Sequence, residues 1–152
     1  MNASTALELK SIERHFHYLH ENPALAFEEH LAAEYIAGKL REWGYEVETG
    51  IGKTGVVARL KVGDGKTSIG LRADTDALPV EEAADLPYKS KVPSKSHMCR
   101  HDAHTSMLLG AAEYLAKTRN FNGTLNLVFQ PAEETMAGAP AMIADGLFER
   151  YP

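Results

Sequence analysis

The sequence predicts an α/β protein, a three-layer sandwich in which a largely parallel sheet lies between helices. Two observations predict this class. Segments with apolar residues at helical spacing alternate with segments of strand character, and one strand–helix–strand succession has the length of a crossover between parallel strands. A chain of 152 residues, 44% of them hydrophobic, can also bury one substantial core.

Two helices are expected in the N-terminal third. Thr5 and Glu8 form a capping-box pattern ahead of apolar residues at helical spacing. Pro23 separates this helix from a second one over about 27–43, which Gly44 is expected to end. The apolar face of the second helix is expected to contain Leu31, Tyr35, Ile36, Leu40 and Trp43.

Strands are expected next. Residues 45–48 form a short strand pattern, and residues 55–62 alternate so that Val56, Ala58, Leu60 and Val62 share one side. The turn sequence Gly63-Asp64-Gly65 precedes a third strand over 68–73. Residues 74–96 contain three prolines and are expected to form an ordered loop.

The C-terminal half continues the alternation. A helix is expected over about 104–117, then a strand over 123–130 that Pro131 ends, and a final helix over about 136–145 that Gly146 stops. The strand at 68–73, the helix at 104–117 and the strand at 123–130 form a β-α-β unit, which requires parallel strands.

Charge and composition exclude several classes of function. The 16 basic residues are dispersed among 21 acidic ones, for a net charge of −5, which weighs against nucleic-acid binding. No apolar stretch approaches the length of a membrane span, and the N-terminus lacks an apolar signal core, so a cytoplasmic location is expected. The single cysteine, Cys99, excludes an internal disulfide and is a buried thiol, a nucleophile or a metal ligand.

Polar residues cluster where strands of the β-α-β unit end and where its helix begins. In open parallel sheets, functional groups gather at the carboxyl ends of the strands. The topology therefore predicts that three clusters meet in one crevice: Asp74 and Asp76; Cys99, His101, Asp102 and His104; Glu133 and Glu134.

This combination of residue types suits metal-assisted hydrolysis of an amide. On an extended backbone, Cys99 and His101 can present a thiolate and an imidazole to one ion, and zinc accepts sulfur, nitrogen and carboxylate ligands together. A second carboxylate can orient the ligating imidazole. Of the adjacent Glu133 and Glu134, one can bind the metal while the other takes a proton from water.

Each cluster also has a simpler interpretation. Taken alone, Cys99 fits a packed core thiol, the paired glutamates fit a solvated helix N-terminus, and the aspartates fit turn or cap positions. A further alternative makes Cys99 a nucleophile assisted by His101 or His104. Four N-terminal histidines are expected on a solvated helix surface without acidic partners: His15, His17, His20 and His30.

Four motifs resemble a known family: LRADTDALP, MCRHDAHTSMLLGAA, FQPAEE and GAPAMIADGLFERYP. In this order and spacing they resemble the N-terminal part of the amidohydrolase branch of the co-catalytic zinc aminopeptidase/aminoacylase superfamily, which includes hippurate hydrolases and, more distantly, carboxypeptidase G. The resemblance implies hydrolysis of N-acyl amino acids or small peptides. It implies Cys99, His101 and Glu134 as metal ligands, Glu133 as the general base and Asp76 as an aspartate that supports the metal site.

The resemblance also implies a divalent metal, zinc first, with manganese, cobalt or nickel as alternatives. The family holds two ions, of which this chain is expected to ligate one well. Two departures stand out: Arg100 replaces the glycine of Cys-Gly-His, and Ser96-His97-Met98 replaces Met-His-Ala. If the glycine position needs a positive φ, Arg100 is strained there.

Members of that family are longer than this chain. Residues 1–152 are therefore expected to be part of a catalytic domain, without the lid and dimerisation domain and the C-terminal part of the sheet. An exposed apolar sheet edge is expected to pair with another chain as a homo-oligomer. The alternative is a non-catalytic fragment that binds metal or self-associates.

Overall fold

The computed structural model describes the backbone of residues 3–152 and the side chains of residues 9–152. The capping box predicted at Thr5 and Glu8 falls outside the described side chains. In chain order the elements are α1 (Ala3–Glu21), α2 (His30–Glu42), β1 (Glu46–Ile51), β2 (Gly55–Val62), β3 (Ser68–Asp74), α3 (His101–Thr118), β4 (Gly123–Gln130), α4 (Gly138–Ala144) and α5 (Leu147–Arg150).

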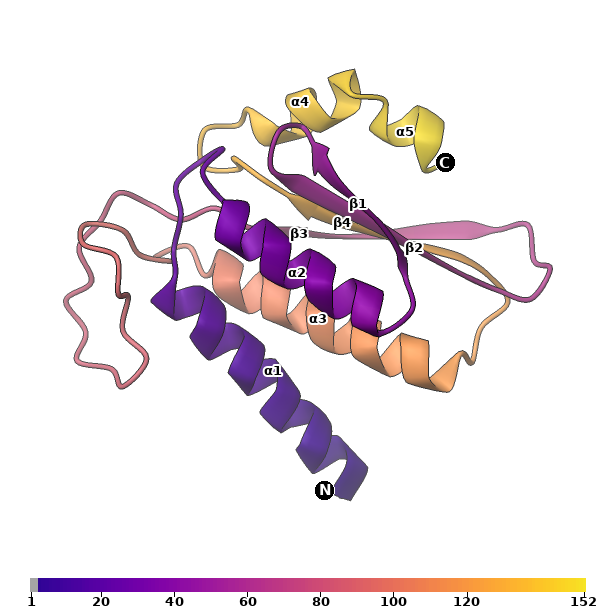
Figure 1. Ribbon diagram of the computed structural model, residues 1–152, viewed down its shortest axis with the longest axis horizontal. Coiled ribbons are helices and arrows are strands. Elements are labelled where there is room, and N and C mark those ends of the chain that lie inside the picture. Colours follow the sequence, from indigo (N-terminus) through magenta and orange to yellow (C-terminus); the bar gives the residue numbers. More distant parts are fainter. Residues whose placement is uncertain (1–2) are drawn as a thin grey trace.

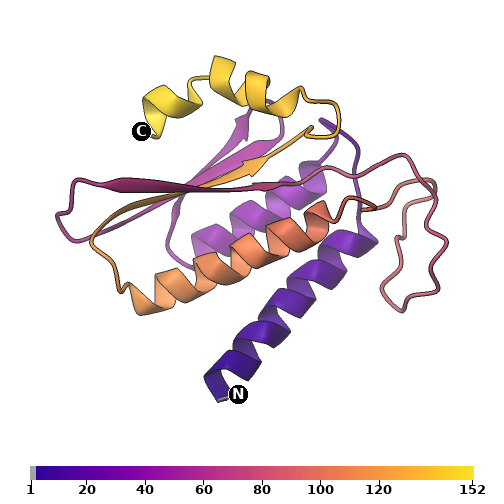
Figure 2. The ribbon, with the colours of Figure 1, turned by 180° about the vertical axis from the view of Figure 1, so that it is seen from behind.

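The elements form three layers, which confirms the α/β class. One sheet has the strand order β1-β2-β4-β3. Helices α2 and α3 cover one face and α1 packs against α3, whereas α4 and α5 lie on the other face (Figure 1). Seen from behind, the long segment between β3 and α3 projects beyond one end of the sheet, and the C-terminal end of α1 lies at that same end (Figure 2). Within residues 3–152, no helix is long and apolar enough to cross a membrane.

The prediction of a largely parallel sheet is wrong. Only β3 and β4 are parallel, and they form the predicted unit with α3, while the β1–β2 and β2–β4 pairs are antiparallel. A parallel pair needs a long crossover, and only the segment between β3 and β4 provides one. Strand β4 lies between β2 and β3, although a short turn joins those two strands.

Alternation along the strands builds a core on each face of the sheet. Val56, Ala58 and Leu60 share one side, as predicted, and belong to the larger core cluster together with residues of α2 and α3. On the other face, Val57 packs with Met142 of α4 in a smaller cluster. Both faces of the sheet are therefore covered, as an α/β sandwich requires.

Positive φ angles explain where predicted helix bounds are wrong. Phe27 has φ 65°, so α2 begins at His30 instead of residue 27, and Met136 has φ 56°, so α4 begins at Gly138. Gly146, with φ 83°, stops α4 as predicted, but the short helix α5 follows. Leu31 is 57% exposed and is not part of the apolar face of α2.

Candidate metal centre

The three predicted polar clusters meet at one edge of the sheet. Asp74, the last residue of β3, is paired with Gln130, the last residue of β4. Helix α3 begins at the same edge with His101, three residues earlier than predicted. The turn after β4 carries Glu133, whose carboxylate reaches the same imidazole.

His101 is at the centre of the cluster and is 4% exposed. Its Nδ1 donates a hydrogen bond of 2.9 Å to the backbone oxygen of Asp76 and lies 3.3 Å from Oδ1 of the same residue. Its Nε2 lies 3.7 Å from carboxylate oxygens of Asp74 and Glu133 and 3.8 Å from Oε1 of Glu134. Asp76 therefore holds Nδ1 and orients the ring, while Nε2 faces the carboxylates of three other acidic residues.

Asp76 connects the imidazole to the turn after β4. Its Oδ2 accepts a 3.0 Å hydrogen bond from the backbone N–H of Glu134. Burial raises the pKa of Asp76, but hydrogen bonds from His101 and from the N–H groups of Glu134 and Glu133 outweigh it and hold the pKa below its usual range. An ionised, buried aspartate behind a ligating histidine fixes both its tautomer and its orientation.

Cys99, His101 and Glu134 each offer one ligand atom, and the three atoms lie within 4.8 Å of one another. Oε1 of Glu134 is buried and has no hydrogen-bond partner. A buried carboxylate oxygen without a partner is costly, and a cation would satisfy it. Sulfur, nitrogen and oxygen donors together match the ligands that zinc accepts. The residues present therefore fit a divalent metal ion.

The electrostatics of the cluster favour a cation. Cys99 is exposed, and the carboxylate of Glu134 beside its thiol, slight desolvation and the charges of Glu133 and Asp74 raise its pKa to about 11. Burial lowers the pKa of His101, but Asp76, Asp74 and Glu134 outweigh it, so the pKa is raised. Both shifts reflect an excess of negative charge, which a divalent ion offsets as it binds the thiolate and the neutral imidazole.

A second group of ligand atoms overlaps the first. Asp74, His101 and His104 also offer atoms within 4.8 Å of one another. However, Asp74 already accepts hydrogen bonds from His104 at 2.7 Å and from Arg72 at 2.8 Å. Nε2 of His101 would be shared by both groups, so they are not two independent centres.

Arg100 has the left-handed conformation that favours glycine, with φ 66° and ψ 29°. Arg100 is therefore strained at this position. The side chain of Arg100 is exposed. This backbone geometry turns the chain sharply between Cys99 and His101, which starts α3 at His101.

The expectation that the N-terminal histidines lie on a solvated surface is wrong for two of them. His15 and His20 are only 3% and 2% exposed. His20 of α1 lies between two carboxylates, with Nδ1 2.5 Å from Asp102 and Nε2 2.9 Å from Glu82. Asp102 directly follows His101, so this buried network anchors the start of α3. His20 and Asp102 are 82 residues apart, and no local sequence signal pairs them.

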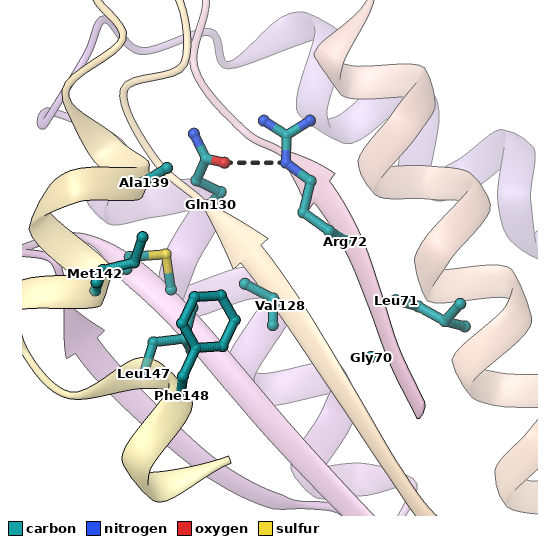
Figure 3. A pocket seen from close by; sticks show the side chains of 10 residues that line it. Gly70, Leu71, Arg72, Val128, Gln130, Ala139, Met142, Leu147 and Phe148 are labelled. Carbon is teal, nitrogen blue, oxygen red and sulfur yellow. Dashed lines mark hydrogen bonds between the residues drawn. The ribbon is translucent and has the colours of Figure 1, made fainter. Parts of the chain in front are cut away.

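A pocket of about 270 Å³ lies on the other face of the sheet, between β3, β4, α4 and α5. Apolar side chains line most of it (Figure 3). At one end, Nε of Arg72 donates a 3.0 Å hydrogen bond to Oε1 of Gln130, and another nitrogen of Arg72 binds Asp74. The pocket thus borders the candidate metal centre through Arg72.

The sequence of this chain is similar to those of known hydrolases. Residues 70–152 match the family described as peptidase family M20/M25/M40. A hippurate hydrolase from Campylobacter jejuni is 59% identical over 135 residues, covering 89% of this chain and 35% of that protein. An IAA-amino acid hydrolase from Arabidopsis thaliana is 42% identical over 132 residues, covering 86% of this chain and 30% of that protein.

Among solved structures, a dinuclear metal binding peptidase of the M20 family, the YXEP protein of Bacillus subtilis, superposes with a TM-score of 0.87 at 38% identity. The match covers 95% of this chain and 41% of that chain. The chain spans about a third of the length of the curated relatives it matches.

Proposed function

Because the chain belongs to peptidase family M20/M25/M40, we propose that it contributes the centre of a metal-dependent amidohydrolase that cleaves the amide bond of N-acyl amino acids or small peptides. The observation that carries this proposal is the convergence of Cys99, His101 and Glu134 around a buried carboxylate oxygen without a partner. The names of relatives that act on hippurate and on IAA-amino acids support small acyl conjugates as substrates.

The residues divide the chemistry between them. Cys99, His101 and Glu134 would hold a divalent ion, which when bound supplies positive charge that polarises a carbonyl and lowers the pKa of water. Glu133, whose side chain is 41% exposed, takes a proton from the attacking water and returns it to the leaving amine. Asp76 keeps the imidazole of His101 oriented from behind.

Zinc is the ion we propose, because thiolate and imidazole ligands suit it, with manganese, cobalt and nickel as alternatives. The family's second ion would need further ligands, since His101 is common to both groups of ligand atoms in residues 9–152.

We also propose that residues 1–152 form part of a catalytic domain and that the lid and dimerisation domain is separate from them. From the charge distribution and the hydropathy of the sequence, we further propose a cytoplasmic location and no binding of nucleic acid.

An assay of the chain with N-benzoylglycine and N-acetyl amino acids, after metal removal and after addition of zinc, tests the function. Zinc-dependent turnover, with a Glu133→Gln variant that binds zinc but loses turnover, is the expected result. Zinc uptake without turnover would favour the non-catalytic metal-binding alternative. A chain that takes up no metal would overturn the proposal.

The same assay separates the cysteine-nucleophile alternative. In that mechanism, alkylation of Cys99 abolishes turnover while a chelator leaves it intact. The raised pKa of Cys99 weighs against this alternative, because a nucleophilic cysteine needs a thiolate near neutral pH.

The open side of β3 is the surface through which we propose self-association. Within residues 3–152, β3 pairs with β4 on one side and with no strand on the other. Ile69 on this strand is 60% exposed. Phe148 of α5 is 63% exposed and lines the pocket on the other face of the sheet with Gly70 and Arg72 of the same strand. A strand edge with exposed apolar side chains is a template for pairing with a second copy.

A further inference from the structure

Glu29 is a fully buried carboxylate that the proposed chemistry does not use. It is 0% exposed and occupies the N-cap position of α2, yet its side chain makes no capping hydrogen bond to that helix. Instead, Oε1 accepts a 2.9 Å hydrogen bond from the backbone N–H of Ala132, 103 residues away. Oε2 accepts one from the hydroxyl of Thr54 in the turn between β1 and β2. Each oxygen therefore serves a distant segment.

Ala132 lies in the turn after β4, and its backbone is held by a hydrogen bond to a residue from another part of the chain. It has φ 50°, a left-handed conformation that is unfavourable for alanine, and it is completely buried. Its backbone oxygen accepts hydrogen bonds from the N–H groups of Ala137 and Gly138, so it organises the segment up to α4. Glu133 and Glu134 follow it directly.

Two buried carboxylates hold this turn from opposite sides of Glu133. Glu29 accepts from the N–H of Ala132, and Asp76 accepts from the N–H of Glu134 at 3.0 Å. Asp76 at the same time orients His101. The position of the two glutamates relative to His101 is thus fixed by a pair of hydrogen bonds from backbone N–H groups.

We propose that Glu29 is a positioning residue for the metal centre, which holds the Ala132 turn so that Glu134 completes the ligand set with Cys99 and His101. This inference rests on the proposed metal-dependent function. Glu29 is not one of the proposed metal ligands; it acts through the backbone of Ala132. Its role depends on accepting hydrogen bonds from Ala132 and Thr54 and not on a transferable proton.

The test compares Glu29→Ala, Glu29→Gln and Glu34→Ala by titration of the chain with Co²⁺, followed by the thiolate-to-cobalt absorption band. Glutamine can accept from Ala132 with its oxygen and donate to Thr54 with its nitrogen, so it should bind Co²⁺ as the wild type does. Glu34, exposed on the same helix, is the matched control and should also behave as the wild type. Glu29→Ala should keep the band from Cys99 but bind about tenfold or more weakly, because one carboxylate ligand is misplaced.

Circular dichroism on each variant checks that it is folded. If Glu29→Ala does not fold, Thr54→Val serves in its place, since it removes only the donor to Oε2; it should lower the affinity by about threefold. Wild-type affinity in the folded alanine variant, or in Thr54→Val when that variant is used, would overturn the inference, as would Glu29→Gln binding as weakly as Glu29→Ala. A wild-type chain that gives no thiolate band refutes the proposed function itself, which is a different outcome.

Discussion

Arg100 lies between two proposed metal ligands in a backbone conformation that glycine adopts without cost. Its φ of 66° is held by hydrogen bonds from its N–H to His97 and to its carbonyl from Ala103 and His104. These contacts use backbone atoms alone. They would remain in a glycine variant, so the strain can be removed without rebuilding the start of α3.

Arg100→Gly is therefore expected to stabilise the chain by about 1 kcal/mol, the lower end of the cost of a left-handed non-glycine residue. The midpoint of urea denaturation measures this effect. Arg100→Ala is the control, because it removes the guanidinium and keeps the strained backbone, and its midpoint should stay within experimental scatter of the wild type. Equal stabilisation by both variants would show that the charge, and not the backbone, is responsible.

His20 pairs with two buried carboxylates, so we expect its side chain to contribute strongly to the stability of the fold. Its ring lies between Asp102 and Glu82, and Glu82 also accepts a 2.7 Å hydrogen bond from the N–H of Ser90. His20→Ala should cost about 3–5 kcal/mol, the range found when one partner of a buried ion pair is removed. The free energy of unfolding in urea measures the loss. His17→Ala, on the same helix but only half-buried, should cost much less.

The network also makes stability depend on pH with a definite sign. Burial lowers the pKa of His20, but the hydrogen bonds to Glu82 and Asp102 outweigh it and raise the pKa above the ordinary 6.5. A raised folded-state pKa gives stability that is complete below pH 6.5 and is lost as the pH rises through the folded-state value. The difference in unfolding free energy between the wild type and His20→Gln should therefore shrink as the pH rises above 6.5. A difference that grows with pH would contradict this assignment.

At the level of elements, the start of α4 packs tightly against the turn after β4. A Cβ atom added to Gly138 would lie 1.6 Å from the backbone oxygen of Pro131. Gly138→Ala should therefore destabilise the chain by about 3 kcal/mol, since α4 must move away from the turn. Gly38→Ala is the matched control on α2, because nothing lies within 4 Å of its added Cβ. It should stabilise the helix by about 0.5–1 kcal/mol, and thermal melting compares the two variants.

Elements with strong local patterns could be predicted from the sequence, and those that depend on distant contacts could not. Strands β2 and β4 match their predicted bounds, because alternation and turn residues define them locally. Three helix starts were misplaced because Phe27, Arg100 and Met136 adopt positive φ angles. The ring of Phe27 is covered by the ammonium group of Lys53, 4.2 Å from its centroid, a contact that no local pattern reveals.

At the level of the whole molecule, the sequence could predict which clusters meet but not what supports them. Asp74 ends β3, His101 begins α3 and Glu133 follows β4 of one β-α-β unit, so the topology alone places them at a common edge. The roles of these residues stay predictions. Glu29 and His20, by contrast, reach the site through contacts that span 103 and 82 residues. Such contacts form only once the sheet and α1 are assembled, and neither Glu29 nor His20 belongs to a recognisable sequence motif.

The open edge of β3 is the surface through which we expect one chain to pair with another. A lysine on an edge strand opposes pairing, since its charge would have to be desolvated between two sheets. Ile69 is 60% exposed, so Ile69→Lys should leave the fold intact. Sedimentation equilibrium should show a dimer for the wild type at high concentration and a monomer for this variant. Leu31→Lys, at a 57% exposed position on α2, should leave the dimer unchanged. A dimer that survives Ile69→Lys but not Leu31→Lys would place the contact on the helical face instead.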